Sequence, residues 1–236
     1  MTIENLLQQL FPLGHDVSFA GVLFSGTGRA GEADVAVIGT RDRAAIGIDL
    51  AFRMAGEVLR VVREHPGRPI LLLVDTSGQK MSRRDETLCL NAYIAHLAKC
   101  LDLARRNGHR IIGLVYAEAV SAGFLSTSLL ADACYALPEA QVRVMNLPAM
   151  ARVTKIPLER LESLSGTSAV FAPGVANYVA MGAVRGIWDG DLAGHLLAAL
   201  RERDDPRTDR RRADGEARGG RMLARSVADR VRFDAA

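Results

Sequence analysis

The turn Ser121-Ala122-Gly123 is the segment whose residue types are best suited to chemistry. It follows an apolar stretch of strand length, 110–116, and opens a predicted helix of small residues that runs to Leu130. Backbone N–H groups at such a turn lack partners within the helix, and two of them can stabilise one oxygen on which negative charge develops. Small side chains let a thioester or carboxylate oxygen come close. Small residues also let a helix pack tightly on a sheet, so these residues alone leave a catalytic and a structural interpretation open.

Ser121 raises a second kind of chemistry, because hydrolases present a nucleophilic serine on a sharp strand-to-helix turn. Such a serine needs a general base within hydrogen-bond reach. The histidines are spread over predicted loops, helix ends and the C-terminal region, at positions 15, 65, 96, 109 and 195. The sequence pattern places none of them beside Ser121, which disfavours a serine hydrolase.

A second polar turn, Asp75-Thr76-Ser77-Gly78-Gln79, follows an apolar run of strand length. Ligands bind at the carboxyl ends of strands in parallel sheets, so this turn is a candidate binding segment. Asp75 could act as a general base or could cap the turn, and capping is the commoner role of an aspartate before Thr-Ser-Gly. Asp85 and Glu86 come after the basic loop 80–84 and are suited to the first turn of the next helix.

No cluster of histidine, cysteine and acidic residues has metal-ligand spacing, so no metal site is predicted. The three cysteines, Cys89, Cys100 and Cys134, form no CxxC pair, which argues against a zinc ribbon and against a disulfide framework. We expect them to be buried as small apolar side chains.

Three glycines, Gly26, Gly28 and Gly31, have the G-x-G-x-x-G spacing of a dinucleotide-binding loop. In that motif the glycines open a helix, whose N-terminus holds the phosphates. Here the strand-like segment 33–39 follows instead. The context therefore disfavours a nucleotide cofactor.

The elements that must position the two polar turns alternate between strand and helix. Residues 48–62 repeat apolar side chains at helical spacing, with Phe52 on the predicted buried face, and this helix ends at His65-Pro66-Gly67. A second helix is predicted over 88–106, closed by Asn107-Gly108. Predicted strands cover residues 17–24, 33–39, 69–74, 110–116, 132–136 and 141–145. The alternation predicts an α/β fold with right-handed crossovers.

Length and charge bound the domain organisation. A chain of 236 residues with 49% hydrophobic content suits one well-buried domain, which we place at residues 1–200. Residues 201–236 carry eleven arginines and eight acidic residues, which accounts for the whole net charge of +3. We expect this segment to be a charged C-terminal arm that is partly disordered or docks on a partner.

Composition also excludes some classes of partner. The charge of the arm is not interleaved with the aromatic residues that stack on nucleic-acid bases, which disfavours nucleic-acid binding. Apolar runs such as Ile111 to Val115 are far shorter than the roughly 20 residues of a membrane span. The N-terminus lacks the basic start and apolar core of a signal peptide. We therefore expect a soluble, cytoplasmic protein without nucleic-acid or membrane partners.

Taken together, the motifs resemble the carboxyltransferase branch of the crotonase superfamily over about residues 21–184. The turn that begins at Asp75 is similar to the strand-end turn of that branch, with Ser77 where proline is usual. Ser121-Ala122-Gly123-Phe124 resembles its Gly-Gly-Ala-Tyr type oxyanion turn. The most specific likeness is the string from Ala131 to Met145, which reads Ala-Asp-Ala-Cys-Tyr-Ala-Leu-Pro-Glu-Ala-Gln-Val-Arg-Val-Met. The resemblance implies the crotonase (ClpP/crotonase-like) fold, a spiral of repeated β-β-α units.

The resemblance also bears on Ser121. In crotonase-related serine peptidases the base is a histidine in the strand after the nucleophile helix, and residues 144–148 occupy that region here. Asn146 cannot accept a proton at neutral pH. Ser121 replaces the first glycine of the family's turn, and Asn146 stands where the branch often has glycine. These departures leave the backbone role of Ala122 and Gly123 intact.

Within the branch, the chain resembles the gamma subunits of biotin-independent malonate decarboxylases, supported by the segments 171–175 and 186–189. The resemblance implies that malonate, held as a thioester on the CoA-like phosphopantetheine arm of an acyl carrier protein, loses CO2 to give the acetyl thioester. It implies no permanently bound cofactor and no biotin. Because the chain has one oxyanion turn and such sites use two, it implies a beta subunit that shares the active site. The acyl carrier protein (delta) subunit and the acyl-carrier transferase (alpha) subunit are the other implied partners.

On this resemblance, the backbone N–H groups of Ala122 and Gly123 are the predicted catalytic donors to the oxygen of an enolate. The predicted substrate-binding residues are Thr76, Ser77, Gly78, Gln79, Ser121 and Phe124. Two alternatives stay open. The chain could be a subunit of a biotin-dependent acyl-CoA carboxyltransferase, or a non-catalytic scaffold whose C-terminal arm docks partners.

Overall fold

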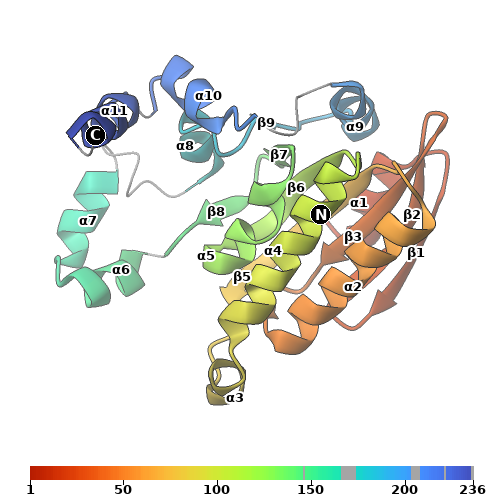
Figure 1. The fold of residues 1–236 in the computed structure, drawn as a ribbon, viewed down its shortest axis with the longest axis horizontal. Coiled ribbons are helices and arrows are strands. Elements are labelled where there is room, and N and C mark those ends of the chain that lie inside the picture. Colours follow the sequence, from red (N-terminus) through yellow and green to blue (C-terminus); the bar gives the residue numbers. More distant parts are fainter. Residues whose placement is uncertain (146, 166–173, 203–207, 221, 235–236) are drawn as a thin grey trace.

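The computed structural model describes residues 1–145, 147–165, 174–202, 208–220 and 222–234 (Figure 1). The strands are β1 (His15–Ala20), β2 (Leu23–Ala30), β3 (Ala33–Thr40), β4 (Ala44–Ile46), β5 (Ile70–Gln79), β6 (Ile111–Val120), β7 (Ala133–Ala136), β8 (Gln141–Arg143) and β9 (Gly186–Ile187). The first helices are α1 (Ile3–Leu10), α2 (Ile48–Glu64), α3 (Arg83–Thr87), α4 (Leu90–Arg106), α5 (Ser121–Leu125) and the 3-10 helix η1 (Ser128–Leu130). The later helices are α6 (Leu147–Thr154), α7 (Leu158–Ser165), α8 (Val175–Ala180), α9 (Leu192–Arg201), α10 (Arg211–Ala217) and α11 (Ala224–Asp234). This order confirms the predicted α/β class.

The strands form one mixed sheet with β5 and β6 near its centre, in the order β1-β2-β3-β5-β6-β7-β9. The first two pairings are antiparallel, and the pairings from β3 onward are parallel. The strand predicted over 17–24 is wrong in extent. The chain reverses at Gly21, whose positive φ of 72° suits a tight turn, and β1 and β2 form a hairpin there.

Each of the two central strands pairs with two sets of neighbours. The first part of β5 pairs with β3, and its end, after an irregularity at Asp75, pairs with β4. In the same way β6 pairs first with β7 and then, near its end, with β8. The chain therefore contributes two consecutive strand segments before each of the helices α2, α4 and α5, which is a repeated β-β-α unit. Thr76 to Gln79, which we expected in a turn, instead continue β5.

Helices cover both faces of the sheet (Figure 1). α2 and α4 pack on one face over apolar residues that include Leu72 and Val115, whereas α1 and α9 pack on the other over residues that include Leu71 and Leu114. The predicted helix 48–62 is confirmed, but the prediction that Phe52 is buried is wrong. Its side chain is 60% exposed and lies against the rings of Tyr93 and His96 on α4.

Asp85 lies in the first turn of α3, as its position predicted, and its side chain caps the start of α2. Its backbone N–H donates to Ser82 at the start of α3, and its buried carboxylate accepts from the N–H of Ile48 at 2.8 Å, the first residue of α2. The hydroxyl of Ser82 donates to the same carboxylate. The Ser82 and Ile48 hydrogen bonds hold the pKa of Asp85 below its usual range. Asp85 thus ties the segment after β5 to the start of α2.

The glycines with dinucleotide-like spacing have a packing explanation. Gly26 and Gly28 lie within β2, where a Cβ would overlap the backbone of β1 and the ring of Phe11 respectively. Gly31 occupies the turn between β2 and β3 with a positive φ of 58°. No helix begins there, which agrees with the rejection of a nucleotide loop.

The C-terminal segment packs on this chain through α10. Cβ atoms added to Gly182 or Gly215 would overlap the backbone of Arg211 or Met181, so the chain at the end of α8 and α10 lies in direct backbone contact. Arg218 adds hydrogen bonds to the carbonyl oxygens of Val179 and Val184 at 2.9 and 3.1 Å. The described residues 208–220 are therefore held on the body of the protein.

The helices α6, α7 and α11 stand apart from the sheet (Figure 1). In α6 and α11 no residue is buried, and in α7 only Leu161 is. Short helices depend on tertiary packing for their stability, so these three have little support from the described part of this chain. No helix within the described ranges is long and apolar enough to cross a membrane.

Candidate active site

The two polar segments singled out in the sequence lie against each other. Gly78, near the end of β5, has a positive φ of 103°, and a Cβ there would be 3.4 Å from the Cβ of Ser121. A Cβ on Gly123 would be 2.6 Å from the Oγ1 of Thr76. The end of β5 and the start of α5 therefore meet without intervening side chains. Glycine at both positions is required for this approach, which is the structural role that the sequence left open.

The N–H groups of Ala122 and Gly123 lie in the first turn of α5, where a helix has no internal acceptors. No side chain caps this helix start within the described residues. The predicted helix to Leu130 is wrong in extent, because α5 ends at Leu125 and η1 follows. A helix of five residues has a small macrodipole. The site therefore depends on the direction of individual N–H groups.

Two hydroxyl groups fix the peptide planes of α5. The carbonyl oxygen of Ala122 accepts from both the N–H and the Oγ of Ser126, at 3.0 and 2.7 Å. That carbonyl belongs to the same peptide plane as the N–H of Gly123, so these bonds fix where the N–H points. Thr127 donates in the same way to the carbonyl oxygen of Gly123 at 2.5 Å. Ser126 and Thr127 are site residues that sequence reasoning missed, although two buried hydroxyls after a small-residue turn were a visible signal.

Ser121 adopts a left-handed backbone conformation with φ of 49°. Such conformations are rare for residues other than glycine, and Ser121 stands where the resembling family has glycine. No described contact joins Ser121 to a histidine. His109 is buried at the end of α4 and bonds the carbonyl of Arg68, and His195 stacks on Trp188. Asn146, on which the sequence argument against a serine hydrolase also rested, lies outside the described residues.

The expected capping of its own turn by Asp75 is wrong, because β5 continues through this residue and its carboxylate joins two other segments. Its side chain is buried, and its two carboxylate oxygens accept from the N–H of Arg43 at 2.8 Å and from the N–H of Glu118 at 3.2 Å. It thus holds the turn after β3 against the centre of β6. Glu86 lies in the first turn of α3, as predicted.

The other predicted substrate-binding residues differ in exposure. Ser77 is exposed and Gln79 and Ser121 are partly exposed, so they are accessible from solvent. Thr76 is fully buried, and its hydroxyl donates to the carbonyl oxygen of Ala44 at 2.7 Å. Phe124 is also buried and packs edge-on against Tyr178. Thr76 and Phe124 support the turn from within the chain, and a contact of either with substrate stays a prediction.

An ionic network that the sequence did not reveal lies beside the turn. Glu118, three residues before Ser121, pairs with Arg43 and with Arg143 at 2.9 Å each. Arg143 is also the strand neighbour of Val120. An acidic residue inside an otherwise apolar strand was the available signal, since a partly buried carboxylate needs a partner. The network joins β4, β6 and β8 at the edge that carries the turn.

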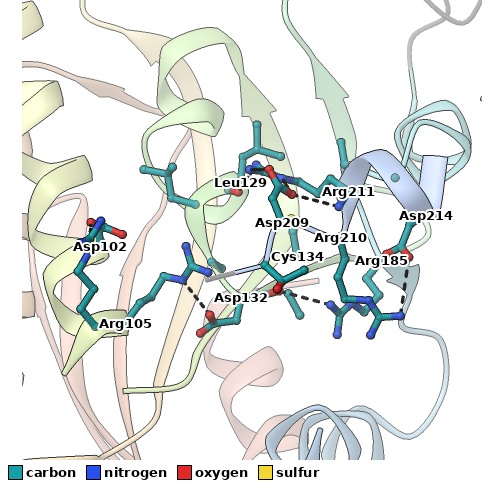
Figure 2. Close-up of a pocket in the computed structure, with 17 residues that line it drawn as sticks. Asp102, Arg105, Leu129, Asp132, Cys134, Arg185, Asp209, Arg210, Arg211 and Asp214 are labelled. Atoms are coloured by element: carbon teal, nitrogen blue, oxygen red, sulfur yellow. Dashed lines mark hydrogen bonds and ion pairs between the residues drawn. The ribbon is translucent and has the colours of Figure 1, made fainter. Parts of the chain in front are cut away.

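A cavity of about 750 Å³ lies elsewhere, between the end of α4, the start of β7 and α10 (Figure 2). Its charged lining is largely paired, with Arg105 bonded to Asp132 and Arg211 to Asp209. The Arg211 guanidinium lowers the pKa of Asp209. The cavity is at the beginning of β6, whereas Ser121 follows its end.

The cysteines offer no reactive thiol near either place. Cys134 lines the cavity, and burial raises its pKa to about 12, so the thiol stays protonated at neutral pH. Cys100 is buried as well, and burial raises its pKa. The prediction that Cys89 is buried is wrong, because it is exposed at the start of α4. No group of side chains in the described chain could hold a metal ion.

Solved structures similar to this chain share its fold. A Pseudomonas malonate decarboxylase hetero-tetramer in complex with coenzyme A aligns with a TM-score of 0.76 and 23% identity over 97% of each chain. A Pseudomonas MdcD-MdcE hetero-dimer aligns with a TM-score of 0.72 and 24% identity over 98% of each chain. The transcarboxylase 12S core aligns with a TM-score of 0.69 and 17% identity, covering 87% of this chain and 44% of the other. The predicted crotonase-type carboxyltransferase fold is confirmed.

Sequence comparison identifies the family. A curated relative from Malonomonas rubra, named malonyl-S-ACP:biotin-protein carboxyltransferase MADD, is 32% identical over 233 residues, covering 86% of this chain and 80% of the relative. Residues 41–235 match the family described as malonate decarboxylase gamma subunit. The chain belongs to the malonate decarboxylase gamma subunit family.

Proposed function

We propose that this chain forms, with a beta subunit, the site that decarboxylates a malonyl thioester of an acyl carrier protein to the acetyl thioester and CO2. The observation that carries the proposal is the direct contact between the end of β5 and the turn of α5, in a chain of the malonate decarboxylase gamma subunit family. In this contact Gly78 and Gly123 let the two segments pack closely, and the first N–H groups of α5, which have no acceptor within their helix, lie beside the end of β5. In this proposal the chain is an enzyme subunit with carboxyl-transfer chemistry that acts within a hetero-oligomer.

The reaction needs a place for one developing charge. As the bond between the α-carbon and the carboxylate carbon breaks, CO2 leaves and its bonding electrons form an enolate whose oxygen carries the charge. The N–H groups of Ala122 and Gly123 are the proposed donors to that oxygen, and they lower the barrier without a side-chain base. The enolate carbon then takes up a proton, which completes the acetyl thioester.

The remaining residues have supporting roles in this proposal. Ser77, Gly78 and Gln79 border the thioester and its phosphopantetheine arm, which is a substrate carrier. Thr76 and Phe124 hold the two segments together from beneath, and Ser121 borders the pocket. The proposal includes no permanently bound cofactor.

A second subunit is needed because this face of the chain is incomplete. Leu125 at the end of α5, Val144 and Met145 after β8, and Val153 on α6 are exposed apolar residues. Leu223 just before α11, and Val227 and Val231 within it, are spaced four residues apart and are also exposed. Exposed apolar groups of this kind mark protein interfaces. They support a beta subunit that covers the turn and completes the site.

The organisation beyond the site follows from the same proposal. The Pseudomonas relatives are a hetero-dimer and a hetero-tetramer. We propose that this chain likewise assembles with an acyl carrier protein (delta) subunit and an acyl-carrier transferase (alpha) subunit in the cytoplasm. The catalytic domain comprises residues 1–200, and the arm 201–236 contributes α11 to partner contacts.

The test is to purify the chain alone and with its beta subunit, and to measure CO2 release from a malonyl thioester. We expect release from the complex and not from either subunit alone. Full activity of the lone chain would disprove the shared site. A complex that forms but releases no CO2 would disprove the decarboxylase.

A second candidate is a subunit of a biotin-dependent carboxyltransferase, which the name of the Malonomonas rubra relative favours. In that reaction the carboxyl group passes to biotin rather than leaving as free CO2. Adding avidin to the complex distinguishes the two, because avidin sequesters biotin. Inhibition by avidin, together with transfer of labelled carboxylate to free biotin, would select this candidate.

A further inference from the structure

An exposed surface of aromatic and basic residues lies beside the proposed site, on α2, α3 and α4. Its centre is the cluster of Phe52, Tyr93 and His96, with ring centroids 6.3 and 6.4 Å from Phe52. Met81 and Leu88, on either side of α3, are 79% and 50% exposed. We call these five residues the α2–α4 patch. Exposed apolar residues that gather in this way mark an interaction site.

The patch is continuous with the proposed active site. Lys80 directly follows Gln79 at the end of β5, and its N–H donates to the carbonyl oxygen of Ile46 at 2.9 Å. Arg84 on α3 bonds Asp49 in the first turn of α2, one helical turn from Phe52. The loop that leaves the substrate-binding segment thus runs directly onto the patch.

The exposed charges around the patch are mostly positive. Lys80, Arg83, Arg84 and Lys99 are exposed, against the exposed carboxylates of Asp49 and Glu86. Asp49 is already paired with Arg84, and the nearby carboxylate of Asp85 is buried between Ser82 and Ile48. Arg83 and Lys99 have no carboxylate partner in the described chain. The patch therefore favours an acidic partner surface.

We propose that the acyl carrier protein docks on the α2–α4 patch through an acidic surface, so that its thioester arm enters beside Ser77 to Gln79. This inference rests on the proposed function, because that function requires a carrier domain next to the site. Arg83 and Lys99 attract and orient the carrier, and Phe52 and Met81 supply the apolar centre of the contact. The face of α5, α6 and α11 remains available to the beta subunit.

The experiment uses the complex of this chain with its beta subunit and a double variant, Arg83→Glu with Lys99→Glu. Binding of the malonyl-loaded carrier is measured by fluorescence anisotropy, and turnover is measured with the carrier and with malonyl-CoA. We expect carrier binding to weaken at least about tenfold and the KM for the carrier to rise similarly, because like charges would face each other. Turnover of malonyl-CoA stays unchanged. Raising the ionic strength weakens binding by the unchanged complex more than binding by the variant.

The matched control is Arg201→Glu, an exposed arginine at the end of α9 on the other side of the sheet. Equal binding by the unchanged and doubly substituted complexes would overturn the proposal, as would loss of the beta subunit from the variant. An equal loss with malonyl-CoA would also overturn it, since the residues would then serve the site itself. A complex that binds the carrier through the patch but releases no CO2 would support docking and disprove the decarboxylase.

Discussion

The two ends of β6 carry regions of opposite character. At its beginning, a cavity of about 750 Å³ is lined by paired arginines and aspartates where α10 packs on the body (Figure 2). At its end, Ser121 to Gly123 meet the end of β5 through small side chains. The cavity is a junction within the chain, and its charges stabilise one another. At the turn, the first N–H groups of α5 have no acceptor within their helix, and such donors are what a charge-stabilising site requires.

The two regions differ in whether their polar groups already have hydrogen-bond partners within the chain. Around the cavity, Arg211 bonds Asp209 and the carbonyl oxygen of Leu129 at 2.9 Å, so its donors already have acceptors within the chain. At the turn, the carbonyl of Ala122 is satisfied by Ser126, while the N–H of Gly123, in the same peptide plane, points the opposite way. The charged groups at the cavity are thus paired within the chain, whereas the first N–H groups of α5 have no acceptor within their helix.

The largest expected effect comes from removing one donor at the turn. Replacing the backbone amide of Ala122 by an ester, through incorporation of lactic acid, deletes the N–H and leaves the side chain unchanged. We expect kcat for malonyl thioester to fall about a hundredfold, or about 3 kcal/mol in barrier. Ala122→Gly, which keeps the N–H, is the control and should retain most of the activity. A loss below threefold for the ester would remove Ala122 from the oxyanion site.

The cavity region is tested by Gly215→Ala, which adds a Cβ against the carbonyl of Met181. We expect the contact between α10 and the body to weaken by about 2 kcal/mol, because a rigid backbone atom must shift. Trypsin should then cleave after the arginines of the C-terminal segment several times faster. Ala217→Ser, at an exposed position of the same helix, is the control. Decarboxylation should persist, and its loss would show that the two ends of β6 act together.

Ser126→Ala tests whether the donors at the turn are held in place. The hydroxyl is buried and bonds the carbonyl of the peptide that carries the N–H of Gly123, so its loss frees that peptide to reorient. We expect kcat to fall about fivefold, which corresponds to the roughly 1 kcal/mol of a typical hydrogen bond. Ser126→Thr, which keeps the hydroxyl, should restore most of the rate. A change in the melting temperature alone, with kcat intact, would give Ser126 a purely structural role.

Much of the fold was predictable because its elements have strong local patterns. The apolar spacing of 48–62 and the stop at His65-Pro66-Gly67 give α2 with its observed end, and the buried run before Asp75 gives the first part of β5. The burial of Phe52 was predicted wrongly because helical periodicity identifies the apolar face of a helix but not how much of that face is covered. Phe52 lies at the border of the covered face of α2, where it contacts Tyr93 and His96 of α4. The second halves of β5 and β6 were missed because they pair with the short strands β4 and β8, and no local pattern reveals such pairings, although a strand over 141–145 was predicted.

The sequence indicated the two segments of the candidate site but not how they meet. Residue types pointed to the turns at 76–79 and 121–124, and the structure brings these together through Gly78 and Gly123. The roles of Ser126, of Asp75 as a clamp on Arg43 and Glu118, and of the Glu118 network depend on contacts between residues far apart in sequence. Such contacts are set by the sheet register, which one sequence does not specify.

The smallest expected effect concerns the backbone of Ser121. A left-handed conformation costs a residue with a Cβ about 1–2 kcal/mol, and glycine avoids that cost while losing about 0.5–1 kcal/mol in chain entropy on folding. Ser121→Gly should therefore stabilise the protein by about 0.5–1 kcal/mol and raise the melting temperature by about 2 °C. Ala122→Gly, at a helical position without positive φ, should lower it by a similar amount. If Ser121→Gly lowered the melting temperature instead, the inference that Ser121 is strained would be wrong. The kcat of the same variant measures what the serine hydroxyl adds to the site.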